Sequence, residues 1–223
     1  MLRAIHPDDA QFKLIPYNCA PLSQTMSEFR VYFEIGRDHI LDYSDGYDHI
    51  LFVVSLCALY LMRDWRQILV LVTAFTIGHS VTLALSVLDI VTVKSELIEF
   101  LIPLTIFITS VSNLFKDEEN LGTGPLQLNY LFAGVFGLVH GLGFSNYLRG
   151  ILGKDERIVS QLLAFNLGLE VGQIIIVVLF LVAAFIMVDL FSVNRRDWKM
   201  IISSAIAGIA LMLMKEKAYW LLD

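Results

Sequence analysis

The sequence contains little cysteine and few charged residues, and each of these two shortages excludes a class of protein. Its 223 residues include 2 Cys, 5 Pro and 17% charged residues, whereas a typical soluble domain carries about 25% charged residues. Cys19 and Cys57 are too few for a disulfide framework. The net charge of −6, from 16 basic and 22 acidic residues, does not supply the basic surface that nucleic acids require. Intrinsic disorder is excluded too, because disordered segments combine low hydrophobicity with high charge.

The abundant residues are apolar, and they form long runs. Hydrophobic residues make up 57% of the chain, and its mean hydropathy is +0.68. A helix needs about 20 apolar residues to cross about 30 Å of hydrocarbon, and the runs lack the alternation that is typical of membrane β-strands. We therefore expect an all-α integral membrane protein with about six transmembrane helices, over residues 50–62, 68–88, 97–115, 126–147, 158–188 and 200–214.

The first and last of these runs are short for a membrane span. The run over 50–62 has 13 residues, which corresponds to about 20 Å of helix. A spanning helix must therefore begin earlier and include Asp48 and His49, which places this pair within the membrane or at its edge. The last run can reach both interfaces if Lys199 and Lys215 extend their ammonium groups toward water.

An amphipathic pattern precedes the first run. It predicts a helix over 26–46 that lies at the membrane interface. Residues 1–25 lack the apolar stretch of a signal peptide, so we expect either a loose tail there or a functional start at Met26, followed by the polytopic membrane domain over 47–221. The apolar face of the helix is predicted to comprise Phe29, Tyr32, Phe33, Gly36, His39, Ile40 and Tyr43.

Ionisable residues within the apolar runs need a function, because insertion of one costs roughly 2.5–3.5 kcal/mol. Counted along alternating helices at about 1.5 Å per residue, all of them fall in the half of the bilayer nearest the N-terminus. Imidazole and carboxylate ligands together suit divalent Ni, Zn, Cu or Fe. The sequence therefore predicts a metal or proton site formed by Asp48, His49, His79, His140 and Glu170.

Polar neighbours are expected to support this site. Hydroxyl groups at Thr73, Thr76 and Ser80 share a helix face with His79 and are expected to hydrogen-bond its imidazole. On a later helix, Asn166 and Gln173 share the face of Glu170. Glycines beside them allow close helix approach, which is expected to bring His140 and Glu170 within reach of one ion.

Structural alternatives exist for the single residues. A lone histidine in a membrane helix is more often held by an interhelical hydrogen bond than by a metal. Asp48 has the position of an N-cap. Glu170 has the weakest structural explanation, since an unpaired carboxylate in the membrane is costly. The agreement of all five groups in depth favours a functional site.

Four motif blocks resemble those of the HupE/UreJ family, in its shorter branch. They are GYDHILF (46–52), FTIGHS (75–80), HGLGF (140–144) and FNLGLEVGQ (165–173), and the resemblance extends over about residues 27–190. It implies a nickel or cobalt permease of the bacterial cytoplasmic (inner) membrane, accessory to hydrogenase and urease maturation. It also implies that Asp48, His49, His79, His140 and Glu170 handle the metal and that His39 matches an upstream histidine of the family.

Two functions from different classes fit these residues. The first is a transporter of a divalent transition metal (Ni, Zn or Co), in which the ion binds near the membrane face closest to the N-terminus. The alternative is an intramembrane zinc hydrolase, in which the metal lowers the pKa of bound water to about 7 and Asp48 or Glu170 acts as base. A metal-stapled scaffold for a partner complex is a third reading.

The expected partners are the metal ion and the lipid bilayer, with no nucleic acid. Association of copies through the glycine-rich helix faces is as compatible with the sequence as a single protomer. The positive-inside rule favours termini outside, with the cytoplasmic positive charge supplied by Arg63, Arg66, Arg195, Arg196 and Lys199.

Overall fold

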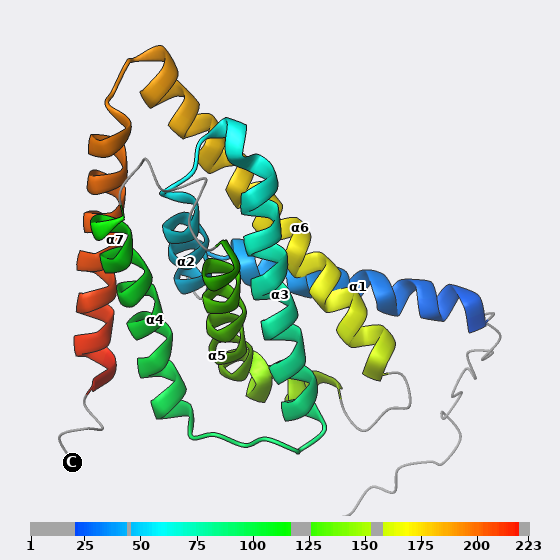
Figure 1. Cartoon of the computed structure of the whole chain (residues 1–223). Helices are drawn as coiled ribbons and strands as arrows, with labels where there is room; N and C mark the ends of the chain where they lie inside the picture. Colours follow the sequence, from blue (N-terminus) through cyan, green and yellow to red (C-terminus); the bar gives the residue numbers. More distant parts are fainter. Residues whose placement is uncertain (1–20, 44–45, 117–125, 153–157, 219–223) are drawn as a thin grey trace, which may run out of the picture.

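The computed structural model describes residues 21–43, 46–116, 126–152 and 158–218, and these ranges are helical with short connections (Figure 1). The predicted all-α class is confirmed. The elements are α1 (Pro21–Leu41), α2 (Tyr47–Cys57), the short 3-10 turn η1 (Met62–Asp64), α3 (Trp65–Val87), α4 (Ser95–Phe115), α5 (Leu126–Leu152), α6 (Ile158–Ala184), the π-helical η3 (Phe185–Leu190) and α7 (Arg195–Lys217).

Four helical segments in the described part of the chain are long and apolar enough to cross a membrane. They are Met62–Val87, Ser95–Phe115, Ile158–Leu190 and Arg195–Lys217. The protein is therefore a membrane protein by this criterion, while the count of six spans stays a prediction. Two apolar helices are shorter: α2, and the stretch Tyr130–Ser145 of α5.

The predicted backward extension of the first run is confirmed, because α2 begins at Tyr47 and contains Asp48 and His49. Its predicted end at residue 62 is wrong, since the helix stops at Cys57. With 11 residues, α2 is about 16 Å long. The apolar residues that follow, Ala58, Leu59 and Tyr60, are buried in a turn. Residues buried in a turn are as apolar as residues buried in a helix, so apolar composition alone does not show where the helix ends.

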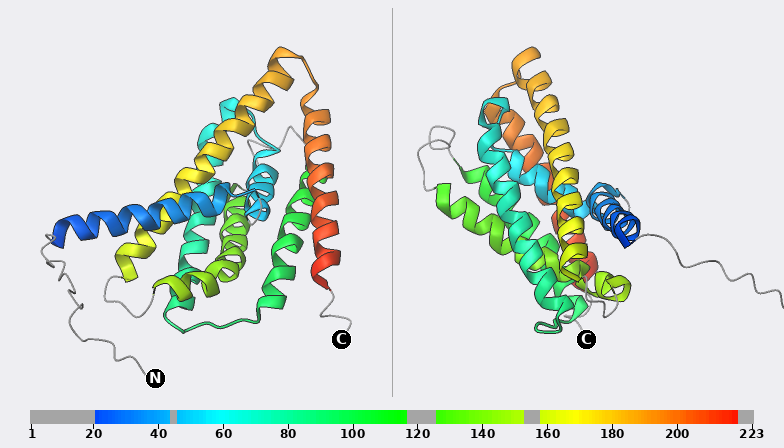
Figure 2. Two further views of the ribbon diagram at one scale, coloured as in Figure 1. Left: turned by 180° about the vertical axis from the view of Figure 1, so that it is seen from behind. Right: turned by 90° about the vertical axis from the view of Figure 1, so that its right-hand side faces the viewer.

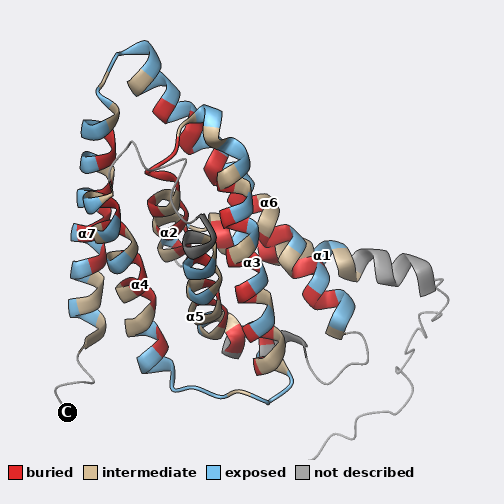
Figure 3. Cartoon of the chain, viewed as in Figure 1, coloured by how far each residue is buried: buried red, intermediate tan, exposed pale blue. Residues whose placement is uncertain are grey.

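The helices pack most extensively in three pairs, α3 with α5, α1 with α6, and α4 with α7. Figures 1 and 2 show α4 and α7 side by side at one edge of the molecule, with α1 crossing the long, inclined α6 at the other. The short α2 lies between these two edges and contacts α1, α3, α4, α6 and α7. Buried residues follow the inner faces of these helices, while the outer face of α7 is exposed (Figure 3).

The amphipathic helix before the first run is present as α1, but its bounds differ from the prediction. It begins at Pro21 rather than Met26, and proline is favoured in the first turn of a helix. Tyr32 and Ile40 of the predicted apolar face are buried, but Tyr43 lies beyond the helix end and is 87% exposed. The interfacial location of α1 stays a prediction, and residues 1–20 of the expected tail lie outside the described residues.

Glycines allow α1 and α6 to touch through their backbones. A Cβ atom at Gly36 would overlap the carbonyl oxygen of Phe165, and one at Gly168 would overlap that of Phe33. Such close crossing between helices requires small residues. It brings the C-terminal turn of α1, which carries His39, against the bundle.

Charged side chains anchor α7 at both of its ends. At the first end, Arg195 Nη2 donates to the carbonyl of Leu59 at 2.9 Å and lies 3.6 Å from Asp64 Oδ2. At the other end, Lys217 Nζ lies 2.8 Å from Glu99 Oε2 of α4. The pairs Arg195–Asp64 and Lys217–Glu99 thus mark opposite ends of the α7 helix.

Candidate metal centre

Four histidines from four different helices form one cluster, with His49 at its centre. The ring centroid of His49 (α2) lies 4.7 Å from that of His39 (α1), 5.9 Å from His79 (α3) and 5.2 Å from His140 (α5). His79 and His140 are fully buried, and His49 is 3% exposed. The structure therefore brings together three of the residues that the sequence predicted as ligands, with His39 beside them.

The sharp connection between α1 and α2 places His39 beside His49. The backbone N–H of Gly46 donates to the carbonyl of Asp42 at 2.9 Å. A Cβ atom at Gly46 would overlap the carbonyl oxygens of His39 and Asp42. A side chain at this position would therefore push the two helices apart, and glycine is required by space.

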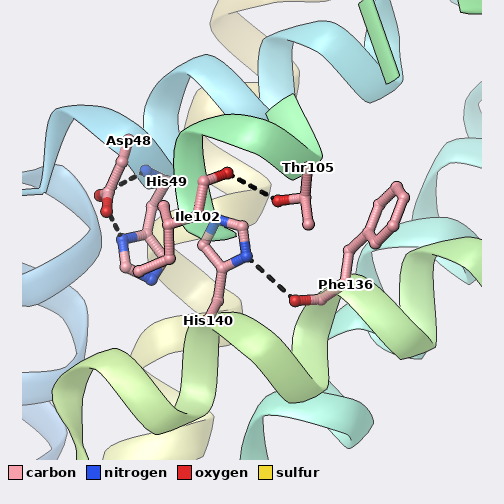
Figure 4. A network of polar contacts seen from close by, with 6 residues as sticks. All are labelled: Asp48, His49, Ile102, Thr105, Phe136 and His140. Atoms are coloured by element: carbon pink, nitrogen blue, oxygen red, sulfur yellow. Dashed lines mark hydrogen bonds and ion pairs between the residues drawn. The ribbon is translucent and has the colours of Figure 1, made fainter. Parts of the chain in front are cut away.

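Asp48 orients the imidazole of His49. Its Oδ1 accepts from His49 Nδ1 at 2.8 Å and from the backbone N–H of His49 at 2.7 Å (Figure 4). An ionised carboxylate only accepts hydrogen bonds, so the ring proton lies on Nδ1. The lone pair of Nε2 is then available, and this atom is buried without a hydrogen-bond partner among the described residues.

His140 has the same arrangement with a backbone acceptor. Its Nδ1 donates to the carbonyl oxygen of Phe136, one helical turn earlier, at 3.0 Å (Figure 4). Its Nε2 is buried and unpartnered. Histidines that bind a metal almost always donate their other ring N–H to a carboxylate or a backbone carbonyl. His49 and His140 both meet this condition.

The other two histidines also direct free nitrogens into the cluster. Nε2 of His39 and both ring nitrogens of His79 are buried and lack a hydrogen-bond partner within the described ranges. One ligand atom each of His39, His49 and His79 lie within 4.8 Å of one another. Two nitrogens bound at about 2.1 Å to one ion lie at most about 4.2 Å apart, so binding requires only a small inward movement of the rings.

Phenylalanine side chains surround the cluster. The ring of Phe144 lies 3.8 Å from that of His39, and the rings of Phe52 and Phe75 lie 4.9 Å and 5.2 Å from that of His140. In such apolar surroundings an unpaired polar atom is costly, at about 1–3 kcal/mol. Buried polar groups are normally satisfied, whereas five imidazole nitrogens of this cluster have no hydrogen-bond partner among the residues that the structure describes.

A cavity of about 820 Å³ leads to this cluster. His39, His49, His140 and Asp48 line it, and the fully buried His79 lies behind them. The remaining lining residues are Ile35, Asp38, Leu41, Asp42, Tyr43, Glu99, Ile102, Gly143 and Phe144. The site is thus reachable from one side of the molecule.

Glu170 lies outside the histidine cluster. Its Oε1 accepts a hydrogen bond from Thr73 Oγ1 at 2.9 Å, across the contact between α6 and α3. Thr73 precedes His79 by six residues, about 9 Å along the helix. The structure therefore does not bring Glu170 to His140 as the sequence analysis expected.

The expected supporting residues make other contacts. Thr76 Oγ1 donates to Gln173 Oε1 at 2.7 Å, and Ser80 Oγ donates to the carbonyl of Thr76 at 2.7 Å. Asn166 Nδ2 donates to the carbonyl of Leu162 at 2.8 Å. The prediction that hydroxyls orient His79 is therefore wrong. Thr73 and Thr76 bond across to α6, and Ser80 bonds to its own preceding turn, as serine in helices often does.

The sequence analysis missed the acidic residues of the cavity. The sequence analysis assigned no role in the site to Asp38, Asp42 or Glu99. All three line the cavity. Asp38 and Asp42 are four residues apart and flank His39, and this spacing was a signal for a shared surface.

The comparisons with known proteins give a family. A family profile described as HupE / UreJ protein matches residues 18–222. Comparisons with curated proteins and with solved structures found no match. The resemblance of the four motif blocks is thus confirmed, and it extends over nearly the whole chain. The chain belongs to the HupE/UreJ protein family.

Proposed function

We propose that the protein transports a divalent transition metal ion across the membrane and holds the ion with His39, His49, His79 and His140. The observation that carries this proposal is the set of buried, unpartnered imidazole nitrogens that face one another from four helices. The association of the family with nickel and cobalt transport supports it, as do the four candidate membrane spans.

The ligand chemistry suits transport of a late first-row transition metal ion such as Ni²⁺. Neutral imidazoles bind Ni, Co, Zn and Cu, whereas Mg and Ca require oxygen ligands. The carboxylate of Asp48 hydrogen-bonds to His49 and acts on the site through that histidine. A site of mostly neutral ligands binds the ion and also allows its release, as transport demands.

The alternative, an intramembrane zinc hydrolase, needs a free general base beside the metal. The volume of the cavity falls in the range of about 300–1,000 Å³ that small organic ligands occupy. However, neither carboxylate that the sequence offered as the base is free beside the cluster, because Asp48 is engaged with His49 and Glu170 contacts Thr73. This favours transport over hydrolysis.

Metal content and flux together test the proposal. Purified protein incubated with Ni²⁺ should retain the ion, and proteoliposomes should accumulate it. His49→Ala and His140→Ala should lose both properties. His6→Ala, a histidine of the N-terminal segment ahead of the described helices, is the matched control and should retain both. Glu170→Gln should keep the bound metal, because we assign Glu170 to the contact between α3 and α6.

The outcomes separate the candidate functions. Retained Ni²⁺ with no flux in proteoliposomes would contradict transport and favour the hydrolase or a scaffold. Wild-type protein without bound metal, under conditions where the protein is folded, would contradict every metal-based function.

A further inference from the structure

Carboxylates dominate the polar wall of the cavity in front of the histidines. Asp38, Asp42, Asp48 and Glu99 line it, from α1, the α1–α2 connection, α2 and α4. The lining residues in the described part of the chain include no Lys or Arg. Clefts lined by one sign of charge between apolar walls focus the electrostatic field and concentrate counter-ions.

The exposure of these side chains decreases toward the histidines. The side chain of Asp38 is 64% exposed, that of Glu99 46%, that of Asp48 22% and that of His49 4%. Carboxylates at the mouth are therefore in contact with water, and the innermost one, Asp48, holds a cluster histidine. The same cavity is therefore lined by exposed carboxylates and by a nearly buried histidine.

The inner end of this wall carries an independent sign of a ligand. Nε2 of His49 and Nε2 of His140 are buried and have no hydrogen-bond partner in the described part of the chain, and both residues line the same cavity. An acidic surface alone would bind ions loosely, but here it ends at donor atoms that suit a transition metal.

Cationic side chains compensate two of the carboxylates from outside the lining. Arg37 Nη2 lies 2.8 Å from Asp38 Oδ1, and Lys217 Nζ lies 2.8 Å from Glu99 Oε2. Glu99 and Lys217 come from different helices, α4 and α7. The ammonium group of Lys217 thus reduces the negative charge at the mouth.

We propose that this cavity is the aqueous vestibule through which a hydrated divalent cation reaches the histidines, and that the Glu99–Lys217 pair sets the rate of capture. This inference rests on the proposed transport function and adds its access route. Glu99 attracts the ion electrostatically without ligating it in the cluster. Lys217 opposes that attraction, so the two residues affect the capture rate in opposite directions.

The test measures the initial rate of Ni²⁺ capture by the full-length protein in detergent, with a metal indicator as competitor, at low and high salt. At low salt Glu99→Gln should lower the rate by about two- to fivefold, and Lys217→Gln should raise it by a similar factor. The double variant should be close to wild type. Glu96→Gln is the matched control, because Glu96 is exposed one turn earlier on α4 and does not line the cavity.

Two further measurements, at high salt and at saturating Ni²⁺, separate the electrostatic effect from loss of the histidine site. At 1 M salt the Debye length is about 3 Å, so the rates of the four variants should converge. The amount of Ni²⁺ bound at saturation should be unchanged in every variant. Bound Ni²⁺ with equal capture rates in Glu99→Gln, Lys217→Gln and wild type at low salt would overturn the vestibule and leave the histidine site intact. Absence of bound Ni²⁺ in wild type would overturn both proposals.

Discussion

Asp48 is the residue on which the geometry of the site depends most directly, although it contributes its charge through another side chain. Its Oδ1 receives both the ring N–H and the backbone N–H of His49. This fixes the tautomer and the orientation of the ring.

Asp48→Asn should therefore weaken metal binding without removing a ligand. Loss of such an orienting partner typically costs about 10–100-fold in metal affinity. The measurement is a competition titration with a chelator, using Ni²⁺. Asp189→Asn serves as control, since Asp189 is exposed in η3. Equal affinities of Asp48→Asn and wild type would show that Asp48 does not orient His49 for binding.

Replacement of His79 should preserve or raise the stability of the metal-free protein but abolish its stabilisation by metal. It is fully buried, and neither of its ring nitrogens has a partner among the described residues. Replacement by a well-packed apolar ring removes the desolvation cost of about 1–3 kcal/mol. His79→Phe should thus unfold at an equal or higher temperature than metal-free wild type, yet gain no stability from added Ni²⁺.

Wild-type protein should gain such stability, because a ligand that binds only the folded state raises its stability. Thermal unfolding with and without Ni²⁺ checks both statements. A large loss of stability in metal-free His79→Phe would indicate that His79 is structural rather than a ligand.

The sequence predicted that His49, His79 and His140 lie close together, which the structure confirms, but it wrongly placed Glu170 beside His140, for a physical reason. Depth along a helix follows from counting residues, and His49, His79 and His140 were placed by that count. Whether two side chains meet also depends on the rotation and crossing of their helices. Glu170 was expected at the right depth, but its face of α6 contacts Thr73.

At the level of elements, glycine contacts hold the helices close enough for the histidines to meet. The crossing of α1 and α6 depends on Gly36 and Gly168, whose Cβ positions are occupied by backbone carbonyls. Since His39 belongs to α1, this crossing also positions one member of the cluster.

Gly168→Ala should destabilise the protein and weaken metal binding together. Overpacking typically costs about 1–3 kcal/mol, and here the obstruction is the backbone of Phe33, which cannot rotate away. Gly208→Ala is the matched control, because nothing lies within 4 Å of its Cβ position. Thermal unfolding and Ni²⁺ titration of both variants check the prediction, and equal behaviour would contradict the crossing.

Helix identity was more predictable than helix ends. Each of the six apolar runs corresponds to a helix from α2 to α7, because sustained apolar composition requires internal backbone hydrogen bonding in lipid. The end of α2 was not predictable, since Leu59 and Tyr60 are as apolar and as buried as helical residues. The start of α1 at Pro21 was missed because no apolar periodicity marks its first turn.

At the scale of the whole molecule, α7 gives a measure of membrane thickness. Its 23 residues extend about 34 Å, close to the roughly 30 Å of the hydrocarbon core. The pairs Arg195–Asp64 and Lys217–Glu99 lie at its two ends. The vestibule therefore opens on the membrane side where α4 begins and α7 ends.

Cysteine labelling tests this topology. In a background with Cys19→Ser and Cys57→Ser, Glu96→Cys and Arg196→Cys should react with a membrane-impermeant thiol reagent from opposite sides of sealed vesicles. Both native residues are exposed, and each lies in the first turn of its helix, Glu96 in α4 and Arg196 in α7. Labelling of both cysteines from the same side would contradict a spanning α7.

The central claim is that one transition metal ion binds among His39, His49, His79 and His140. X-ray absorption spectroscopy of the Ni²⁺-loaded protein tests it most directly, because imidazole ligands give a characteristic multiple-scattering pattern. We expect a nickel shell with several imidazoles, which is lost in the double variant His49→Ala/His140→Ala and retained in His6→Ala. A shell without imidazole, or a spectrum unchanged by the double substitution, would contradict it.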